Sequence, residues 1–202
     1  MPESIISKGF CQNARRGVPL TKIDPEVFRR GIFNLRTRRF GTAAELLIQR
    51  LLGANKGRTQ FHDLYDDRNS HRIEVKFSTV NTSSDEPINL ANLLAAIEKA
   101  GLERAVPYSS WKNFKFDCNI QQVKIVEFDV LYYGLFFSDV IVIFRIDTDV
   151  IPNDRAIFFS NKQHKGNVGE GQFHINNTTL PHHLKTYLYK VIGYEDFLDL
   201  LE

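Results

Sequence analysis

The stretch that decides the fold is Gln-Phe-His-Asp-Leu-Tyr-Asp at residues 60–66, followed by His-Arg-Ile-Glu-Val-Lys-Phe-Ser-Thr at residues 71–79. The residues between them, 67–70, read Asp-Arg-Asn-Ser, which is a typical polar turn. Two strand-forming segments on either side of such a turn predict a β-hairpin. We therefore expect two antiparallel strands here, with Asp66 opposite His71.

The hairpin register brings three charged side chains together. Side chains alternate along a strand, so Glu74 and Lys76 share one face and Val75 points to the other. Counting outward from the turn then places Asp63 opposite Glu74 on that face. Two carboxylates so close repel each other when both are ionised, and a divalent cation between them relieves the repulsion. The register predicts a Mg²⁺ site at Asp63 and Glu74, with Lys76 stabilising charge on an attacked phosphate.

The charged residues of the hairpin also allow other interpretations. An Asp near a turn and a Glu-Lys pair on a solvated strand are common in proteins without any active site. Asp66 and Asp67 compete with Asp63, although both fall at the end of the hairpin, beyond the register that faces the glutamate. A second and poorer match combines Asp117 with Lys124, because glutamine replaces the acid two residues before that lysine.

The rest of the chain predicts helices before, between and after strands. Asp24 and Pro25 are a typical start for a helix over 25–36, and Gly53 is well placed to end a helix over 42–53. The remaining expected elements are helices at 87–100, 178–189 and 194–201 and strands at 121–126, 128–137, 140–146, 155–160 and 171–176. The expected buried residues of the first and third helices are Val27, Phe28, Phe33 and Leu35, and Leu90, Leu93, Leu94 and Ile97. This order predicts an α/β (α+β) domain with a mixed central sheet flanked by helices.

Length and composition favour one soluble domain. The chain has 202 residues, of which 43% are hydrophobic. We expect a single domain over 1–202, with an N-terminal arm at 1–22, a core that carries the hairpin site at 23–146, and a C-terminal, partly helical part at 147–202. No apolar run reaches the ~18 residues of a membrane span, and the first residues lack a signal-peptide pattern. We expect a cytoplasmic protein of a bacterium or archaeon in which Cys11 and Cys118 are free thiols.

Charge is unevenly distributed along the chain. Residues 1–60 hold 12 Lys/Arg against 4 Asp/Glu, a net of +8, whereas the remainder holds 14 against 20, a net of −6. A basic N-terminal third suggests a surface that meets a polyanion such as DNA, and a merely solvated basic face is equally compatible. We expect Arg36, Arg38 and Arg39 to contact phosphates.

The hairpin residues resemble the PD-(D/E)XK nucleases, and type II restriction endonucleases in particular. His62-Asp63 corresponds to the first half of that motif, with His in place of the usual Pro, and Glu74-Val75-Lys76 corresponds to the second. Glu45, on the helix before the hairpin, matches an acid that some members add to the metal site. The resemblance implies a restriction-endonuclease-like core, Mg²⁺ dependence with Mn²⁺ able to substitute, and hydrolysis of DNA to 5′-phosphate ends. It also implies a homodimer acting on symmetric double-stranded DNA, and a cognate DNA methyltransferase in the same host without direct contact.

A glycine-rich polar segment at 161–177 is the expected site of base reading. Amide side chains pair with adenine and lysine with guanine, and glycines let a loop follow a groove closely. The expected DNA contacts are Gln163, His164, Lys165, Asn167, Gln172 and His174, with Lys124 near the site or the DNA. The histidines at 164, 174, 182 and 183 do not favour zinc, since no cysteine lies near them.

Two rivals to the restriction enzyme follow from the same sequence. The first is a nuclease of the same fold that acts in DNA repair or junction resolution. The second is a non-catalytic DNA-binding module, which would show no nicking with Mg²⁺ or Mn²⁺.

Overall fold

A computed structural model describes residues 23–201 of the chain except 83–86, 88, 99–103 and 163–167. The expected arm at 1–22, including Cys11, lies outside the described residues. The helices are α1 (Pro25–Phe33), α2 (Thr37–Leu52), α3 (Leu93–Glu98), α4 (Leu180–Thr186) and α5 (Tyr194–Leu201), with 3₁₀ helices η2 (Tyr108–Asn113) and η3 (Arg155–Ile157). The strands are β1 (Asn55–Lys56), β2 (Leu64–Asp66), β3 (His71–Thr79), β4 (Asp117–Val123), β5 (Val130–Phe136), β6 (Ile141–Asp147), β7 (Ser160–Lys162), β8 (Val168–Asn176) and β9 (Leu188–Ile192).

A mixed six-stranded sheet forms the centre of the protein, as the sequence predicted. Its strand order is β1-β2-β3-β5-β6-β9, and β3 and β5 run parallel whereas the other neighbours are antiparallel. The expected hairpin is formed by β2 and β3, and its register pairs Asp66 with His71 and Leu64 with Ile73. The predicted pairing of the two strands at the turn is therefore confirmed.

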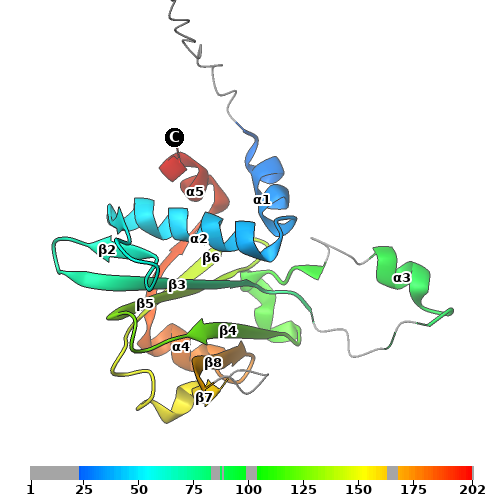
Figure 1. Cartoon of the computed structure of the whole chain (residues 1–202). Helices are drawn as coiled ribbons and strands as arrows, with labels where there is room; N and C mark the ends of the chain where they lie inside the picture. Colours follow the sequence, from blue (N-terminus) through cyan, green and yellow to red (C-terminus); the bar gives the residue numbers. More distant parts are fainter. Residues whose placement is uncertain (1–22, 83–86, 88, 99–103, 163–167, 202) are drawn as a thin grey trace, which may run out of the picture.

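The two faces of this sheet are covered by different layers (Figure 1). Helices α1, α2 and α5 cover one face, where Leu47 and Ile48 pack with Ile73 and Val75 in one hydrophobic cluster. The opposite face contacts a second sheet of order β4-β8-β7, and α4 lies on the same side. Because Val75 faces the helices, Glu74 and Lys76 face the side of the second sheet.

The first two helices differ from the prediction at their ends. Asp24 caps α1 as expected, since its Oδ1 accepts hydrogen bonds from the backbone N–H groups of Glu26 and Val27. The helix ends three residues early, at Phe33, and the expected burial of Val27 is wrong, because that side chain is 62% exposed. Helix α2 begins at Thr37 rather than at 42, because the extended backbone of Arg36 allows a new helix to start there. Gly53 ends it in the left-handed conformation, as predicted.

The buried positions expected in the third helix are also wrong. Helix α3 is described over Leu93–Glu98 and stands away from the sheets in Figure 1. Leu90, Leu94 and Ile97 are 98%, 76% and 60% exposed, and Leu93 is also exposed. The helix was expected over 87–100, whereas Leu90 lies in a turn before α3, and helical spacing does not supply a surface that would cover these residues. No helix in the described part of the chain is long and apolar enough to cross a membrane.

The second half of the chain contains strands that the sequence placed differently. Strand β4 begins four residues before the expected 121, and it is interrupted by a bulge at Gln122, whose φ is +58°. The segment expected as a strand at 155–160 begins with the helix η3 over Arg155–Ile157, and within this segment only Ser160 belongs to a strand, β7. The helix expected at 178–189 ends at Thr186, and the next residues form β9, which pairs with the outer side of β6.

Candidate active site

Asp63 is held against the edge of β3 by its backbone and by its carboxylate. Its N–H donates to the carbonyl of Ile73 (3.1 Å) and its carbonyl accepts from the N–H of Gly57 (2.8 Å). Its Oδ2 accepts from the N–H of Val75 at 2.9 Å. The carboxylate thus satisfies a backbone donor of β3 just beyond the last paired residue of β2, and its position is fixed by the fold.

Glu74 and Lys76 meet the Asp63 carboxylate on the same side of β3. The ammonium Nζ of Lys76 forms an ion pair with Oε1 of Glu74 and lies 3.9 Å from Oδ2 of Asp63. The three side chains are largely shielded from water, with 12% of Glu74, 24% of Lys76 and 25% of Asp63 exposed. The structure therefore brings together the three residues that the hairpin register singles out.

The surroundings of Glu74 disfavour its charged form. Burial raises the pKa of Glu74 to about 7, the Lys76 charge opposes this rise, and the carboxylates of Asp63 and Glu127 add to it. A nearby cation favours the ionised form of such a carboxyl group. The site thus combines a buried acid with a second acid that repels it, and added positive charge would stabilise both.

Glu45 of α2 belongs to the same electrostatic group. Burial raises its pKa, and the charge of Asp63 raises it further, whereas the charges of Lys76 and Lys56 lower it. The glutamate is half-buried at the edge of the apolar stripe formed by Ala44, Leu47 and Ile48. Helix α2 therefore contributes a third carboxyl group close enough to sense the charge of Asp63.

The donor set fits a magnesium ion that keeps part of its water. The described residues contain no cluster of three or more His, Cys, Asp or Glu side chains arranged to hold a metal ion. Mg²⁺ is usually bound by one or two carboxylates together with waters and phosphate oxygens, so it does not require such a cluster. Asp63 and Glu74 supply two carboxylates, and the observation that suits a cation there is the raised pKa of Glu74, which burial causes and the Asp63 charge increases.

The competing aspartates serve the hairpin turn. Asp66 accepts hydrogen bonds from the backbone N–H of Arg68 (3.1 Å) and from the Asn69 side chain (2.8 Å), and these contacts lower its pKa. Asp67 contacts the side chains of Asn55 and Arg58. Both carboxylates are occupied at the end of the hairpin, which favours Asp63 as the acid beside Glu74.

The poorer second match is not assembled as a site. Asp117 lies 2.9 Å from Nδ1 of His174, on the second sheet. Lys124 lies 3.6 Å from Glu127 and 3.9 Å from Glu170. The aspartate and the lysine that this match would combine thus have different partners.

The residues expected to contact DNA lie in three places. Gln163, His164, Lys165 and Asn167 lie outside the described residues. Arg36, Arg38 and Arg39 are exposed at the start of α2, which leaves their guanidinium groups accessible. Gln172 and His174 lie on β8 with partly exposed side chains, and Lys124 follows the end of β4.

Sequence reasoning missed two residues that shape the site. Glu127 adds negative charge that acts on Glu74. In the sequence, only its position three residues after Lys124, with which it forms an ion pair, pointed to it. Gly57 approaches the loop before β2 so closely that a Cβ atom there would lie 2.1 Å from the carbonyl oxygen of His62. A glycine between a helix and a strand gave a weak hint of this contact, because close backbone approach requires the absence of a side chain.

Comparison with known proteins adds no family to these observations. No protein-family model matches the chain, and no curated protein sequence matches it significantly.

Proposed function

We propose that the protein is a Mg²⁺-dependent nuclease that cuts double-stranded DNA, as a type II restriction endonuclease with a restriction-endonuclease-like core. The observation that carries this proposal is the meeting of Asp63, Glu74 and Lys76 on one side of β3. Two acids and an amine in a shielded site are the groups that metal-assisted phosphodiester hydrolysis needs. Mn²⁺ is expected to substitute for Mg²⁺.

Each residue has a role that follows from its position. Asp63 and Glu74 would hold the cation. The Val75 N–H fixes the Asp63 carboxylate, and burial disfavours the ionised form of Glu74. When bound, Mg²⁺ supplies Lewis-acid stabilisation of charge on the phosphate and activates water. Lys76 lies between the two acids, from where its ammonium group can neutralise charge developing on the attacked phosphate. Glu45 would orient the metal's water ligands or join them in binding the ion.

The proposal includes the setting in which such an enzyme acts. Duplex recognition sites of restriction enzymes are commonly two-fold symmetric, so a homodimer would match each half-site with one subunit. Hydrolysis would leave 5′-phosphate ends. A DNA methyltransferase in the same cytoplasm would protect the host DNA, without contact between the two proteins.

Cleavage of defined DNA is the direct test. Purified protein is incubated with plasmid and genomic DNA in Mg²⁺, in Mn²⁺ and in EDTA, and the product ends are sequenced. We expect discrete fragments whose ends share one sequence, and no cleavage in EDTA. Fragments without a common sequence, or cutting only of branched DNA, would identify a repair or junction nuclease instead. DNA binding without any cutting would identify a non-catalytic binding module.

Point variants test whether cleavage depends on the three site residues or on the hairpin as a whole. Lys76→Ala and Asp63→Asn are expected to lower the cleavage rate by at least about 10²-fold while DNA binding persists. Asp67→Asn is the matched control, because it removes a carboxylate from the same hairpin at its exposed end. Equal loss in the control, or full activity of Lys76→Ala, would refute the assignment.

A further inference from the structure

A small pocket lies beside the candidate active site. Its volume is about 250 Å³. Its walls come from the loop before β2, from the start of β3 and from the loop before β5, and they consist of Thr59, Phe61, His62, Arg72, Val126 and Glu127. This volume is below the about 300–1,000 Å³ of pockets that hold drug-sized ligands. The pocket therefore suits one flat ring system rather than a larger molecule.

The pocket adjoins the acids of the candidate active site along β3. Side chains two residues apart on a strand share a face, so Arg72 lies on the same face as Glu74, roughly 7 Å from it along the strand. His62 directly precedes Asp63, and the charge of Glu127 acts on Glu74. A nucleotide whose phosphate is held at Asp63 and Glu74 therefore has its sugar and base within reach of the pocket.

Two apolar side chains flank the pocket and remain accessible. Phe61 is 51% exposed and Val126 is 81% exposed. Isolated exposed apolar residues are common on protein surfaces, but these two line the same pocket. The Phe61 N–H donates to Oγ1 of Thr59 at 3.3 Å, and this hydroxyl lies 3.1 Å from Nδ1 of the buried His62. An exposed aromatic ring on a backbone held in this way is suited to stacking with an unpaired base.

Two charged side chains give the pocket a donor and an acceptor that a ligand can reach. Asp129 accepts from Nε and Nη2 of Arg72 at 3.0 and 2.7 Å, and a guanidinium group has further N–H donors. The Arg72 side chain is partly exposed. The Glu127 side chain is 25% exposed and lies 3.6 Å from Nζ of Lys124, and its carboxylate oxygens can each accept more than one hydrogen bond. Adenine and cytosine match this pair, because each presents an amine donor beside a ring-nitrogen acceptor.

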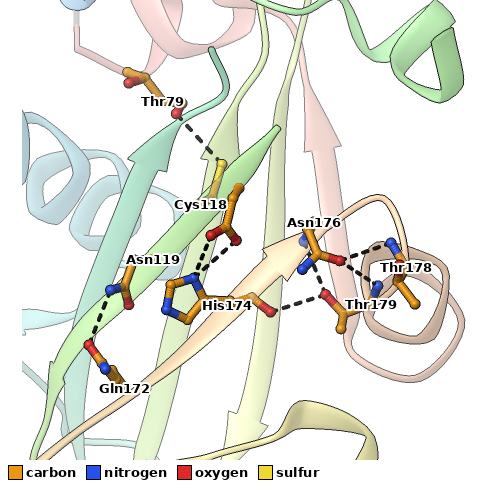
Figure 2. Close-up of polar contacts among 9 residues, drawn as sticks. Thr79, Cys118, Asn119, Gln172, His174, Asn176, Thr178 and Thr179 are labelled. Carbon is orange, nitrogen blue, oxygen red and sulfur yellow. Dashed lines mark hydrogen bonds and ion pairs between the residues drawn. The ribbon is translucent and has the colours of Figure 1, made fainter. Parts of the chain in front are cut away.

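The polar side chains of the second sheet bind one another instead. Figure 2 shows that the Asn119 side-chain NH₂ donates to Oε1 of Gln172, at 3.1 Å, and that His174 is paired through Nδ1 with Asp117, at 2.9 Å. The pocket at the start of β3 is therefore the better candidate for a base contact.

We infer that this pocket takes one nucleobase that leaves the stack of double-stranded DNA, an adenine or a cytosine next to the cleaved bond. The base would stack on Phe61, donate from its amine to Glu127 and accept from Arg72. The inference rests on the proposed function, since the neighbouring acids are what would hold a nucleotide there, and it adds a base contact at that site. Extruding a base costs least when the base is already unpaired, so DNA with an unpaired base reports on the pocket most directly.

Duplexes with one bulged nucleotide test the inference. The whole chain, with Ca²⁺ in place of Mg²⁺ to suppress cleavage, is titrated against labelled duplexes of one sequence that carry a bulged adenine, a bulged thymine or a bulged abasic site. The abasic duplex has the same interruption of the backbone without a base. We expect the adenine duplex to bind about 5- to 150-fold more tightly than the abasic duplex, the range that stacking of one base provides, and more tightly than the thymine duplex. Equal affinity for the adenine duplex and either of the others, or tighter binding of the matching RNA duplexes, would overturn the inference.

Variants assign the preference to the pocket. Phe61→Ala should abolish the preference for adenine over the abasic site, whereas Phe61→Trp, which keeps a flat ring, should retain it. Glu127→Gln should remove the discrimination against thymine, because an amide can donate as well as accept, and it gives a second reading if Phe61→Ala does not fold. Phe158→Ala is the matched control, since it removes an exposed phenylalanine that does not line the pocket. An undiminished preference in Phe61→Ala, or an equal loss in Phe158→Ala, would refute the assignment.

The outcomes distinguish this inference from the nuclease proposal, because the bulged-base preference is measured as binding and requires no cleavage. If Mg²⁺ produces no cuts but Phe61→Ala abolishes the preference for adenine, the nuclease proposal fails and the base pocket stands. If Mg²⁺ produces sequence-defined cuts while the adenine and abasic duplexes bind equally, the base pocket fails and the nuclease proposal stands.

Discussion

Gly57→Ala is expected to displace Asp63 without changing any charged group. A Cβ atom at residue 57 would lie 2.1 Å from the carbonyl oxygen of His62, about 1.3 Å short of the 3.4 Å at which ordinary contact begins. It would also lie 3.1 Å from the carbonyl oxygen of Asp63, which accepts the Gly57 N–H. Both neighbours are backbone atoms, so the segment that positions the carboxylate has to move. A displacement of about 1 Å at a catalytic group can cost about 10²-fold in rate.

The assay combines thermal unfolding with cleavage kinetics. Overpacking costs about 1–3 kcal/mol, which corresponds to a melting temperature roughly 2–12 °C lower for a chain of this size. Gly41→Ala, inside α2, is the matched control, since a Cβ atom there meets nothing within 4 Å. That variant should be about 0.5–1 kcal/mol more stable than wild type, because alanine favours the helix. A Gly57→Ala protein with wild-type melting temperature and wild-type cleavage rate would refute the reasoning.

Two further variants test the fold. Asp24→Ala removes the acceptor for two N–H groups of α1 and should lower the free energy of unfolding by about 1 kcal/mol in urea titrations; no change would show that the cap contributes nothing. Burial lowers the pKa of His183 from 6.5 to about 4, and the charge of His182 lowers it further. Between these two pH values the unfolded chain therefore binds a proton at this histidine that the folded chain does not bind. About 3 kcal/mol of stability should therefore be present above pH 6.5 and lost as the pH falls toward 4. His183→Gln should flatten this dependence, and an unaltered slope in the variant would contradict it.

The local parts of the fold were predictable from the sequence. Asp24 and Gly53 mark helix ends through their own side chain and backbone, and the hairpin register follows from a turn of four residues. The placement of Asp63 beside Lys76 follows from that register, because only short-range geometry is needed to count along two paired strands.

The remaining parts depend on contacts between distant segments. Leu188 to Ile192 form a strand because the outer side of β6 is available to pair with them, and a helical continuation from α4 is equally compatible with their sequence. The exposure of Leu90 and Leu94 has the same cause, since helical spacing does not reveal whether a partner surface exists. The charge of Glu127 acts on Glu74 only after β4 is in place, so no local pattern predicts it.

Because β3 pairs with β5, a strand distant along the chain, Asp63 and Glu74 can come together before they are buried. Asp63 and Glu74 come from one hairpin, whereas Asp129, which binds the backbone and side chain of Arg72 at the start of β3, lies 57 residues away along the chain. Closing so long a loop is slow compared with forming a hairpin. A nascent chain that has emerged only as far as β3 already contains both strands of the hairpin, but the burial that raises the pKa of Glu74 is complete only once the distant strand has paired with β3.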